Sequence, residues 1–349
     1  MKQIIKRDSF LTLMFMLLGC LSLYAADNDL TTKQITIKLE RAGTLPDRIA
    51  SSRKYKITNL KIVGEINGTD LKMIRDMAGS NSTGNSTDGK LSVLDLSEAK
   101  IVEGGDYYYY DYDNNRNNYY YTSNDVIGDK AFYYCRGLTS LTLPDGITSI
   151  GRGAFRNCSG LTSLTLPDGI TEIGNEAFKG CSGLTSLTLP AGNIEIGFGT
   201  FSGCSGLTSL NLPAGITSLT LPTGISTGVD KGPFNGCSGL TSIYVYAEKV
   251  PKIGINHILD INVFEGIDAQ KCTLYVPMGT YSDYWLSGFG DYFENIVEFD
   301  ATGIDKTTTS TEVEEVTRYS VNGQRLYAPT KGLNIVKYSD GSVKKVTVR

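Results

Sequence analysis

The chain has 349 residues, of which 40% are hydrophobic and 20% are charged, and its formal net charge is −4. A chain of this length and hydrophobicity can bury a core. Its slightly acidic balance provides no basic surface for the phosphates of a nucleic acid, so we expect no nucleic-acid partner.

Residues 1–25 are predicted to be a signal peptide. A basic start precedes an apolar run from Phe10, and the segment "LYAAD" offers a cleavage point after Ala25. The alternative is that "LLGC" directs lipid attachment, which would make Cys20 a lipidated N-terminus. Either route exports the chain to the cell surface (outer membrane) or the extracellular medium. No later stretch is long and apolar enough to span a membrane.

Residues 26–125 are predicted to form an N-terminal cap. The stretch "KITNLKIVGEINGTDLKMIRDMAG" (56–79) indicates a strand, a turn and a short helix capped by Asp70. The apolar face of this helix is expected to consist of Leu71, Ile74 and Met77. The composition of "GSNSTGNSTDGK" (79–90) is typical of a flexible loop. "LSVLDLSEAKIV" (91–102) has the leucine spacing L-x-x-L-x-L that recurs further along the chain, so we expect an irregular first unit there.

The stretch "GDYYYYDYDNNRNNYYYTSND" (105–125) holds eight of the 21 tyrosines. They are Tyr107, Tyr108, Tyr109, Tyr110, Tyr112, Tyr119, Tyr120 and Tyr121. Tyrosine is enriched in antibody loops that bind ligands, because it offers a large contact area at a low entropy cost. We therefore predict a ligand-binding loop that projects from one edge of the protein. The alternative is a hairpin whose tyrosines simply alternate between its two faces.

Calcium is a second hypothesis for this loop. Asp106, Asp111, Asp113 and Asn114 carry the oxygen ligands that calcium prefers, but their spacing matches no known calcium loop.

Residues 126–247 contain a sequence repeat marked by five cysteines. Their spacing is 23 residues between the first four and 33 to the last: Cys135, Cys158, Cys181, Cys204 and Cys237. One full copy reads "IGRGAFRNCSGLTSLTLPDGITE" (150–172). The unit that starts at Ile196 has a ten-residue insertion and contains the strand motif twice, in "LTSLNLPAGITSLTLPTGI" (207–225). A fixed period of this size is the signature of a solenoid.

Each unit contains a predicted strand. In "LTSLTLP" (161–167) the leucines point to one side, and the proline ends the strand because it cannot donate to a ladder. A single unit cannot bury its apolar side, but stacked units share a continuous core. Stacking also predicts a phenylalanine ladder at about 4.8 Å per step. Its members are Phe132, Phe155, Phe178, Phe201 and Phe234.

The pattern C-x-x-L-x-x-L-x-L-P…I-G-x-x-A-F-x-x-C resembles the BspA-like leucine-rich repeats of bacterial surface proteins. This resemblance implies a curved α/β repeat solenoid, mostly β with short turns or helices, between irregular caps and a small C-terminal β module. Members of the family are generally taken to be adhesins or binding proteins rather than enzymes.

The repeated cysteines have three explanations. Metal binding is disfavoured, because it needs ligands that converge from different directions and the sole histidine, His257, lies outside the ladder. A disulfide framework is common in exported proteins, but each ladder cysteine stacks on identical neighbours and five leave one over. We therefore expect small, buried, free thiols that fill a tight turn.

The outward side of the predicted strands forms a second candidate binding surface. Two rows of mostly small, uncharged residues run along it: Ser140, Ser163, Ser186, Ser209 and Ser242, and beside them Thr142, Thr165, Thr188, Asn211 and Tyr244. Such a face can hydrogen-bond a protein or a glycan. It is also an ordinary solution for a half-exposed strand, where hydroxyl and β-branched residues are favoured.

Three segments complete the chain. Residues 248–299 are predicted to be a C-terminal cap, with a strand, a proline stop and a helix that holds Trp285. Residues 300–315 are polar and threonine-rich, as in a linker. Residues 316–349 predict three short strands joined by Asn-Gly and Asp-Gly turns. This tail resembles those of exported Bacteroidetes proteins, including sorting domains of the type IX secretion route, although it is short for a complete one.

The sequence gives no indication of catalysis. The single histidine, His257, would have to serve any Ser-His-Asp or Cys-His site, and phosphate-loop, H-E-x-x-H and EF-hand motifs are absent. We expect no enzyme, no cofactor and no resident metal. The expected function is adhesin-like binding of a protein ligand through the solenoid, the tyrosine-rich loop or both. The alternative is a glycan-binding protein or a scaffold component of a surface complex.

Overall fold

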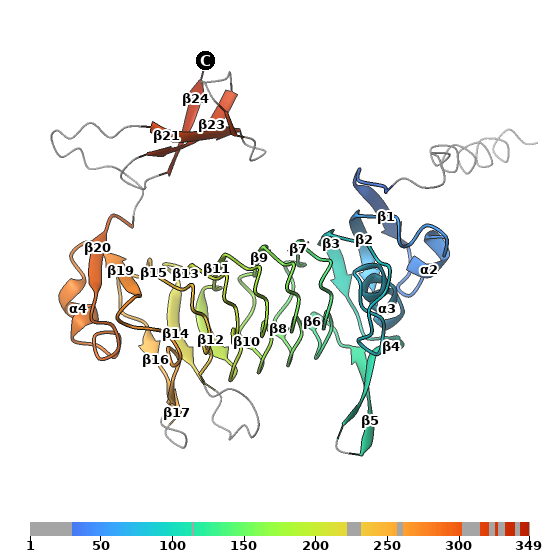
Figure 1. Cartoon of the computed structure of the whole chain (residues 1–349), viewed down its shortest axis with the longest axis horizontal. Helices are drawn as coiled ribbons and strands as arrows, with labels where there is room; N and C mark the ends of the chain where they lie inside the picture. Colours follow the sequence, from blue (N-terminus) through green and yellow to red (C-terminus); the bar gives the residue numbers. More distant parts are fainter. Residues whose placement is uncertain are drawn as a thin grey trace, which may run out of the picture.

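A computed structural model describes residues 30–113, 115–221, 232–256 and 261–301, together with the four strands of a C-terminal module. The predicted signal peptide, Cys20 and His257 lie outside the described residues. The repeat units stack into a solenoid whose strands run side by side in a long row (Figure 1). The prediction of a mostly β leucine-rich repeat solenoid is confirmed.

The first side of the solenoid is a ladder of parallel strands that we call the front sheet. In spatial order its strands are β1 (Ile35–Leu39), β2 (Asn59–Ile66), β3 (Val93–Ile101), β7 (Ser140–Thr142), β9 (Ser163–Thr165), β11 (Ser186–Thr188), β13 (Ser209–Leu212), β15 (Ser242–Val245), β19 (Thr273–Pro277) and β20 (Ile296–Phe299). Pairing is continuous from β1 to β9 and from β11 to β20. Where these halves meet, the Thr185 N–H donates to the Thr162 carbonyl over 3.5 Å.

The register of the front sheet places like residues on one another. Leu141 pairs with Leu164, and the flanking serines and threonines pair in the same way. Leu161, Leu164 and Leu166 are buried, as the strand pattern predicts. Because like residues stack on one another, each added unit extends the core with the same side-chain contacts as the unit before it.

The second side is a shorter ladder that we call the rear sheet. Its strands are β6 (Val126–Ile127), β8 (Ser149–Ile150), β10 (Glu172–Ile173), β12 (Gly192–Ile196), β14 (Ile216–Thr220) and β16 (Lys252–Ile253). The duplicated strand motif of the fourth unit is divided between the sheets, since its first copy forms β13 and its second forms β14. Ile216 and Leu219 are buried there, so the second copy supplies apolar anchors like those of Ile170 and Ile173 in "ITEIG" (170–174).

The third side is a column of tight turns that carries the phenylalanine ladder. All five rings are buried, and the centroids of successive rings lie 5.1–5.5 Å apart with planes within 15° of parallel. The turns also hydrogen-bond to one another, for example from the Phe155 N–H to the Ala177 carbonyl at 2.7 Å. The predicted ladder is confirmed, with steps slightly longer than the strand spacing.

The ladder cysteines are buried free thiols, so the disulfide alternative is wrong for the described cysteines. From the second member onward, each thiol donates a hydrogen bond to the carbonyl of the phenylalanine in the preceding unit, at 2.9–3.2 Å. These pairs are Cys158 with Phe132, Cys181 with Phe155, Cys204 with Phe178 and Cys237 with Phe201. A thiol is small enough for the turn and still supplies a weak donor to a buried carbonyl.

This burial predicts a loss of stability in alkali. It raises the pKa of the ladder thiols, to about 11 for Cys135 and about 12 for Cys237, from an ordinary value near 9. Because the unfolded chain ionises first, the stabilising contribution is complete below pH 9 and is lost as the pH rises towards about 12. Urea unfolding followed by circular dichroism should show the midpoint falling across this window. A Cys237→Ala variant should show a shallower fall, and equal slopes in the two proteins would contradict this explanation.

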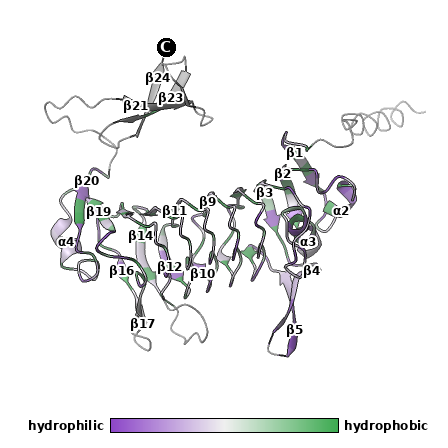
Figure 2. Ribbon diagram, viewed as in Figure 1, coloured by the Kyte–Doolittle hydropathy of each residue, from purple (hydrophilic) through white to green (hydrophobic). Residues whose placement is uncertain are grey.

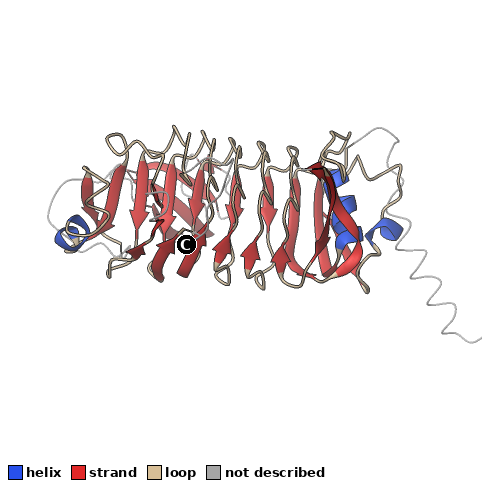
Figure 3. Cartoon of the chain, turned by 90° about the horizontal axis from the view of Figure 1, so that it is seen from below, coloured by secondary structure: helices blue, strands red, loops and turns tan. Residues whose placement is uncertain are grey.

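Irregular caps close both ends of the solenoid, and in Figure 3 the described helices lie only at these ends. The N-terminal cap contains α2 (Leu45–Arg48) and α3 (Gly68–Met77), and the C-terminal cap contains α4 (Tyr281–Trp285), as its sequence predicts. The apolar face of α3 is buried as predicted, at Leu71, Ile74 and Met77.

Asp70 was predicted to be the N-cap of α3, but it lies at the third residue of the helix. Asn67 is the N-cap, and Asp70 completes a capping box by accepting from the Asn67 N–H at 3.0 Å. Asp70 also accepts from the Leu45 N–H at 2.8 Å, so this buried carboxylate joins α3 to α2.

The solenoid is nearly straight in the views of Figures 1 and 3, rather than curved. Curvature follows from a rotation between successive repeats. Where the two ladders run along the same units, both consist of parallel strands with the same spacing, so each step from unit to unit has the same length on the two sides.

Among the described residues three further sheets lie outside these ladders, and two of them are in the C-terminal part of the chain. A short hairpin is formed by β17 (Ile255–Asn256) and β18 (Ile261–Asn262). The C-terminal module is an antiparallel sheet of β21 (Glu315–Ser320), β22 (Arg325–Leu326), β23 (Gly332–Tyr338) and β24 (Val343–Val348), in the order β22-β21-β23-β24. It has one short strand more than predicted, because the two residues of β22 pair with β21.

Candidate functional site

The tyrosine-rich segment forms an antiparallel hairpin of β4 (Gly104–Asp113) and β5 (Arg116–Thr122) that projects from the solenoid near its N-terminal cap (Figure 1). In its register Tyr110 faces Tyr119 and Tyr109 faces Tyr120. Side chains along a strand alternate between faces, so the hairpin has two different sides. Of the two predictions for this segment, the structure shows the second, a hairpin whose tyrosines alternate between its two faces.

The inward side of the hairpin is held by a partly buried cation. Lys130, from the first regular unit, forms an ion pair with Asp111 and lies 5.0 Å from the centre of the Tyr120 ring. Burial alone would lower the pKa of Lys130, but the hydrogen bonds to Asp111 and Tyr120 and the negative charge of these two groups together outweigh it and leave this pKa above its usual range. Asn118 donates to the same carboxylate at 3.0 Å. An isolated two-stranded hairpin is marginally stable in water, so these contacts fix its position.

A fully buried cation, Arg75 of α3, joins the cap to the first unit. Its guanidinium donates to the carbonyls of Lys130, Ala131, Asn81 and Tyr133 at 2.8–3.1 Å. Its carbon centre lies 4.9 Å from the centre of the Tyr109 ring. Its described partners are carbonyls, a serine hydroxyl and a ring rather than a carboxylate.

The outward side of the hairpin is a continuous tyrosine surface. We call it the tyrosine face, and it consists of Tyr107, Tyr110, Tyr112, Tyr119 and Tyr121. The Tyr119 ring centre lies 5.0 Å from those of both Tyr107 and Tyr110. Tyr112, Tyr119 and Tyr121 are 65%, 48% and 53% exposed, which is unusual for such large side chains. In Figure 2 the far end of the hairpin is coloured as hydrophilic.

Tyr108 and Tyr109 were wrongly assigned to the exposed binding loop, because both are buried. The Tyr108 hydroxyl donates to the Asp129 carbonyl at 2.7 Å, and burial raises the pKa of Tyr109 to about 12. The pairing contains a bulge between Gly104 and Tyr109, which shifts the alternation of side chains. Tyr120 is half-buried on the inward side. A role in binding therefore stays a prediction for the five residues of the tyrosine face.

The loop at residues 79–90, predicted to be flexible, has a defined conformation. The Asn81 side-chain oxygen accepts from the N–H groups of Thr83 and Asn85, both at 2.9 Å. Such bonds organise a turn around one asparagine.

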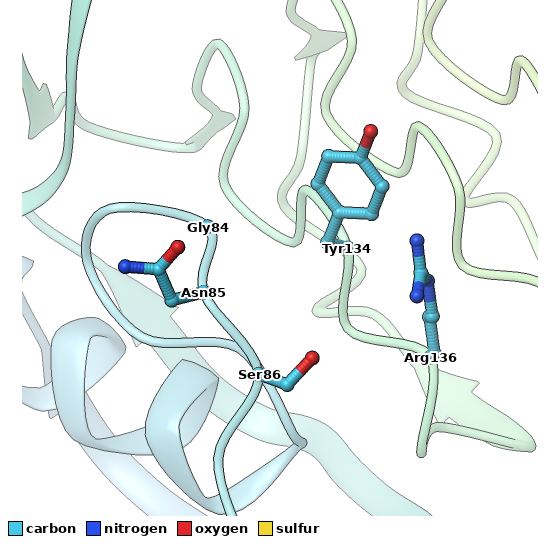
Figure 4. Close-up of a pocket in the computed structure, with 5 residues that line it drawn as sticks. All are labelled: Gly84, Asn85, Ser86, Tyr134 and Arg136. Atoms are coloured by element: carbon cyan, nitrogen blue, oxygen red, sulfur yellow. The ribbon is translucent and has the colours of Figure 1, made fainter.

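A small pocket lies between this loop and the first unit. Its volume is about 310 Å³, and its lining residues are Gly84, Asn85, Ser86, Tyr134 and Arg136 (Figure 4). The Arg136 guanidinium lies 4.7 Å from the Tyr134 ring centre, so the cation already rests on an aromatic partner.

The front sheet carries the predicted serine and threonine rows on its outward side. Ser163, Thr165, Ser186 and Thr188 are exposed, and the corresponding residues of the neighbouring units are at least partly exposed. The same register continues into charged residues at the N-terminal end, where Lys61 pairs with Asp95 at 3.2 Å. A ligand-binding role for these rows stays a prediction.

At the C-terminal end the same outward side becomes aromatic. We call this cluster the aromatic end, and it consists of Tyr244, Tyr246, Tyr275 and Phe299. The Tyr244 and Tyr275 rings stack at 4.5 Å with planes 9° apart. Sequence analysis included Tyr244 in an outward row but missed the other three. The sequence signal was the tyrosine that replaces threonine or asparagine at this strand position.

The described residues contain no group of three or more His, Cys, Asp or Glu side chains placed to hold a metal ion. In the calcium hypothesis, Asp111 is already paired with Lys130, and Asp106 lies 3.9 Å from Lys72. Asn114 lies outside the described residues. In the described part of the chain, no helix has both the length and the apolar character to cross a membrane.

Comparison with known protein families identifies the repeats. Residues 125–254 match the BspA type leucine-rich repeat region in six copies. This repeat region is of the BspA type. The match begins after the hairpin and ends at residue 254, near the start of the C-terminal cap, so the tyrosine face and half of the aromatic end lie outside the matched BspA-type repeats.

Several solved structures are similar to this chain. A leucine-rich repeat protein of T. pallidum is 28% identical over 39% of this chain and 69% of its own, with a TM-score of 0.28. The pneumococcal vaccine antigen PcpA is 16% identical over 70% of this chain and 69% of its own, with a TM-score of 0.36. A leucine-rich cell surface protein of Faecalibacterium prausnitzii A2-165 is 18% identical over 56% of this chain and 65% of its own, with a TM-score of 0.31. No curated protein matches the chain.

Proposed function

We propose that this protein is a non-catalytic binding protein of the cell surface and that it holds a protein ligand on the tyrosine face. The observation that carries the proposal is the arrangement of the hairpin. Five tyrosines lie on one side of it, while Lys130, Arg75 and the buried Tyr109 hold the other side.

The chemistry of the tyrosine face suits a protein partner. Tyrosine combines an apolar ring with a hydrogen-bonding hydroxyl and is enriched among residues that dominate the energy of protein interfaces. Polar residues surround the rings, including Asn117, Arg116 and Asp113 at the end of the hairpin. Aromatic residues with a polar, solvent-accessible rim are the usual anatomy of a protein interface.

Anchoring of the hairpin also favours affinity. Ligand-binding loops lose affinity when binding must first order them. Here the hydroxyl of Tyr108 and the carboxylate of Asp111 already have partners in the first unit. The proposed surface location is supported by the BspA-type repeats and by the predicted signal peptide.

The test replaces only the exposed rings. A Tyr112→Ser/Tyr119→Ser/Tyr121→Ser variant should lose about tenfold or more in affinity for any partner found in a panel of purified extracellular matrix and serum proteins. Its circular dichroism and thermal midpoint should match those of the parent protein, because these residues lie outside the core. Surface plasmon resonance would measure the affinity.

A matched control removes an equal number of exposed side chains from the front sheet. A Ser163→Ala/Thr165→Ala/Thr188→Ala variant should bind as the parent does. If this control loses binding and the tyrosine variant retains it, the ligand site belongs to the strand face and the proposal is wrong.

A further inference from the structure

The outward side of the front sheet changes its chemistry along the solenoid. One row of paired positions starts in the N-terminal cap with Thr36, Lys61 and Asp95 and continues through the threonines of the regular units. It then passes through Asn211, Tyr244 and Tyr275. The row is thus charged near one end, hydroxyl-bearing in the middle and aromatic near the other end.

The fold itself does not require aromatic rings in this row. Thr142 and Thr165 occupy equivalent positions in strands of the same ladder and form the same pairings. The leucines beneath them fill the core in each case. Threonine at this position is sufficient to form the strand. Tyr244 and Tyr275 are therefore not required by the fold, and they give the surface an aromatic character.

The rings of the aromatic end are arranged against one another on the surface. The Phe299 ring meets the Tyr246 ring at 5.2 Å and 88°, and the Tyr244 ring at 5.7 Å and 82°. All four rings are partly exposed rather than enclosed in the core. The cluster thus offers rigid apolar surface that water still reaches.

A hollow of about 390 Å³ adjoins this cluster. Its lining residues are Thr188, Asn211, Pro213, Ala214, Tyr246 and Ala301. The Asn211 amide donates to the Thr188 hydroxyl at 3.2 Å, which fixes the two polar groups relative to each other. The lining contains an aromatic ring, an amide and a hydroxyl, but no lysine, arginine, aspartate or glutamate.

We propose that the aromatic end and its hollow form a binding site for a neutral saccharide. A sugar ring has an apolar face of C–H groups and a rim of hydroxyls. The apolar face would pack on Tyr246, and the hydroxyls would bond to the Asn211 amide and the Thr188 hydroxyl. A few placed polar groups beside aromatic surface are typical of small-ligand sites, and the volume falls within their usual range.

The absence of charge in the lining favours a neutral ligand over an acidic one. An anionic sugar would leave its carboxylate or sulfate without a cation in the hollow, and an unpaired charge is costly to desolvate. This site lies at the opposite end of the solenoid from the tyrosine face (Figure 1). The proposal is therefore independent of the proposed protein-binding function.

The test is a titration of the whole chain with neutral oligosaccharides built from glucose, mannose, galactose, xylose or N-acetylglucosamine, by isothermal calorimetry at millimolar ligand. We expect at least one of these to bind. A Tyr246→Ala variant and an Asn211→Thr variant should each lose about tenfold or more in affinity. Asn211→Thr restores the residue that earlier units carry at this position, so the fold should be retained.

Two controls separate this site from others. Thr142→Ala changes the equivalent row far from the hollow and should leave saccharide affinity unchanged, as should Tyr119→Ser on the tyrosine face. Failure of the whole panel to bind would overturn the proposal. So would saccharide binding that survives both Tyr246→Ala and Asn211→Thr, or that disappears with Tyr119→Ser.

Discussion

Phe178→Ala is expected to lower the free energy of unfolding by about 3–5 kcal/mol, the usual cost of truncating a buried phenylalanine. Phe178 lies in the middle of the ladder, with ring centres 5.1 Å away at Phe155 and 5.5 Å away at Phe201. Truncation removes both ring contacts and leaves a cavity between two units. The neighbouring turns cannot close it, because they are fixed by hydrogen bonds across it, such as that from the Phe178 N–H to the Thr200 carbonyl.

Chemical denaturation with fluorescence and circular dichroism would measure this loss. Units of a solenoid contact mainly their neighbours, so hydrogen exchange should rise most in the units on either side of residue 178. Phe178→Leu should cost less, because it keeps most of the buried volume. Ser186→Ala on the exposed strand face should change stability by no more than about 0.5 kcal/mol. A Phe178→Ala protein as stable as this control would show that the ladder is not an energetic core.

Arg75→Met is expected to be comparably damaging, by about 3 kcal/mol or more. Methionine keeps much of the apolar stem but removes the donors to four carbonyls, among them those of Ala131 and Tyr133. A buried acceptor that loses its partner costs about 1–3 kcal/mol. The damage should concentrate where α3 meets the first unit and the hairpin. Hydrogen exchange of residues 80–81 and 130–134 would report it.

Arg75→Lys separates charge from geometry. Lysine keeps the positive charge but lacks the planar fork that reaches several carbonyls at once, so only partial recovery is expected. Lys90→Met removes an exposed cation from the neighbouring loop and should be nearly neutral. If Arg75→Lys were as stable as the parent, charge alone would account for the role of Arg75.

The repeat made much of this fold predictable. Leu164, Phe178 and Cys181 each recur at a fixed spacing, and stacking of equal units leaves them one common environment. Residues without repeated counterparts were predicted less well. Asp70 was assigned as the cap of α3, but the neighbouring Asn67 takes that position. Asparagine and aspartate are both common N-cap residues, so the local sequence does not decide between Asn67 and Asp70. The hydrogen bond from the Leu45 N–H to Asp70, which joins α3 to α2, is visible only in the structure.

The candidate sites show the same limit. Four consecutive tyrosines begin at Tyr107, and nothing in that run reveals which rings turn inward. The bulge near Tyr109 and the cation at Lys130 decide this, and both depend on tertiary contacts. At the aromatic end, Tyr244 lies within the repeats, whereas Phe299 reaches it from β20, more than fifty residues later. No periodicity connects these two positions.

The thiol hydrogen bonds described above make the repeat units interchangeable. Each unit donates from its cysteine to the unit before it, and its phenylalanine carbonyl accepts from the unit after it. A gain or loss of one 23-residue segment such as 150–172 would therefore leave both junctions chemically unchanged. Each such event would alter the separation of the tyrosine face from the aromatic end by about 4.8 Å. The distance between these two surfaces can therefore change during evolution in steps of one repeat unit.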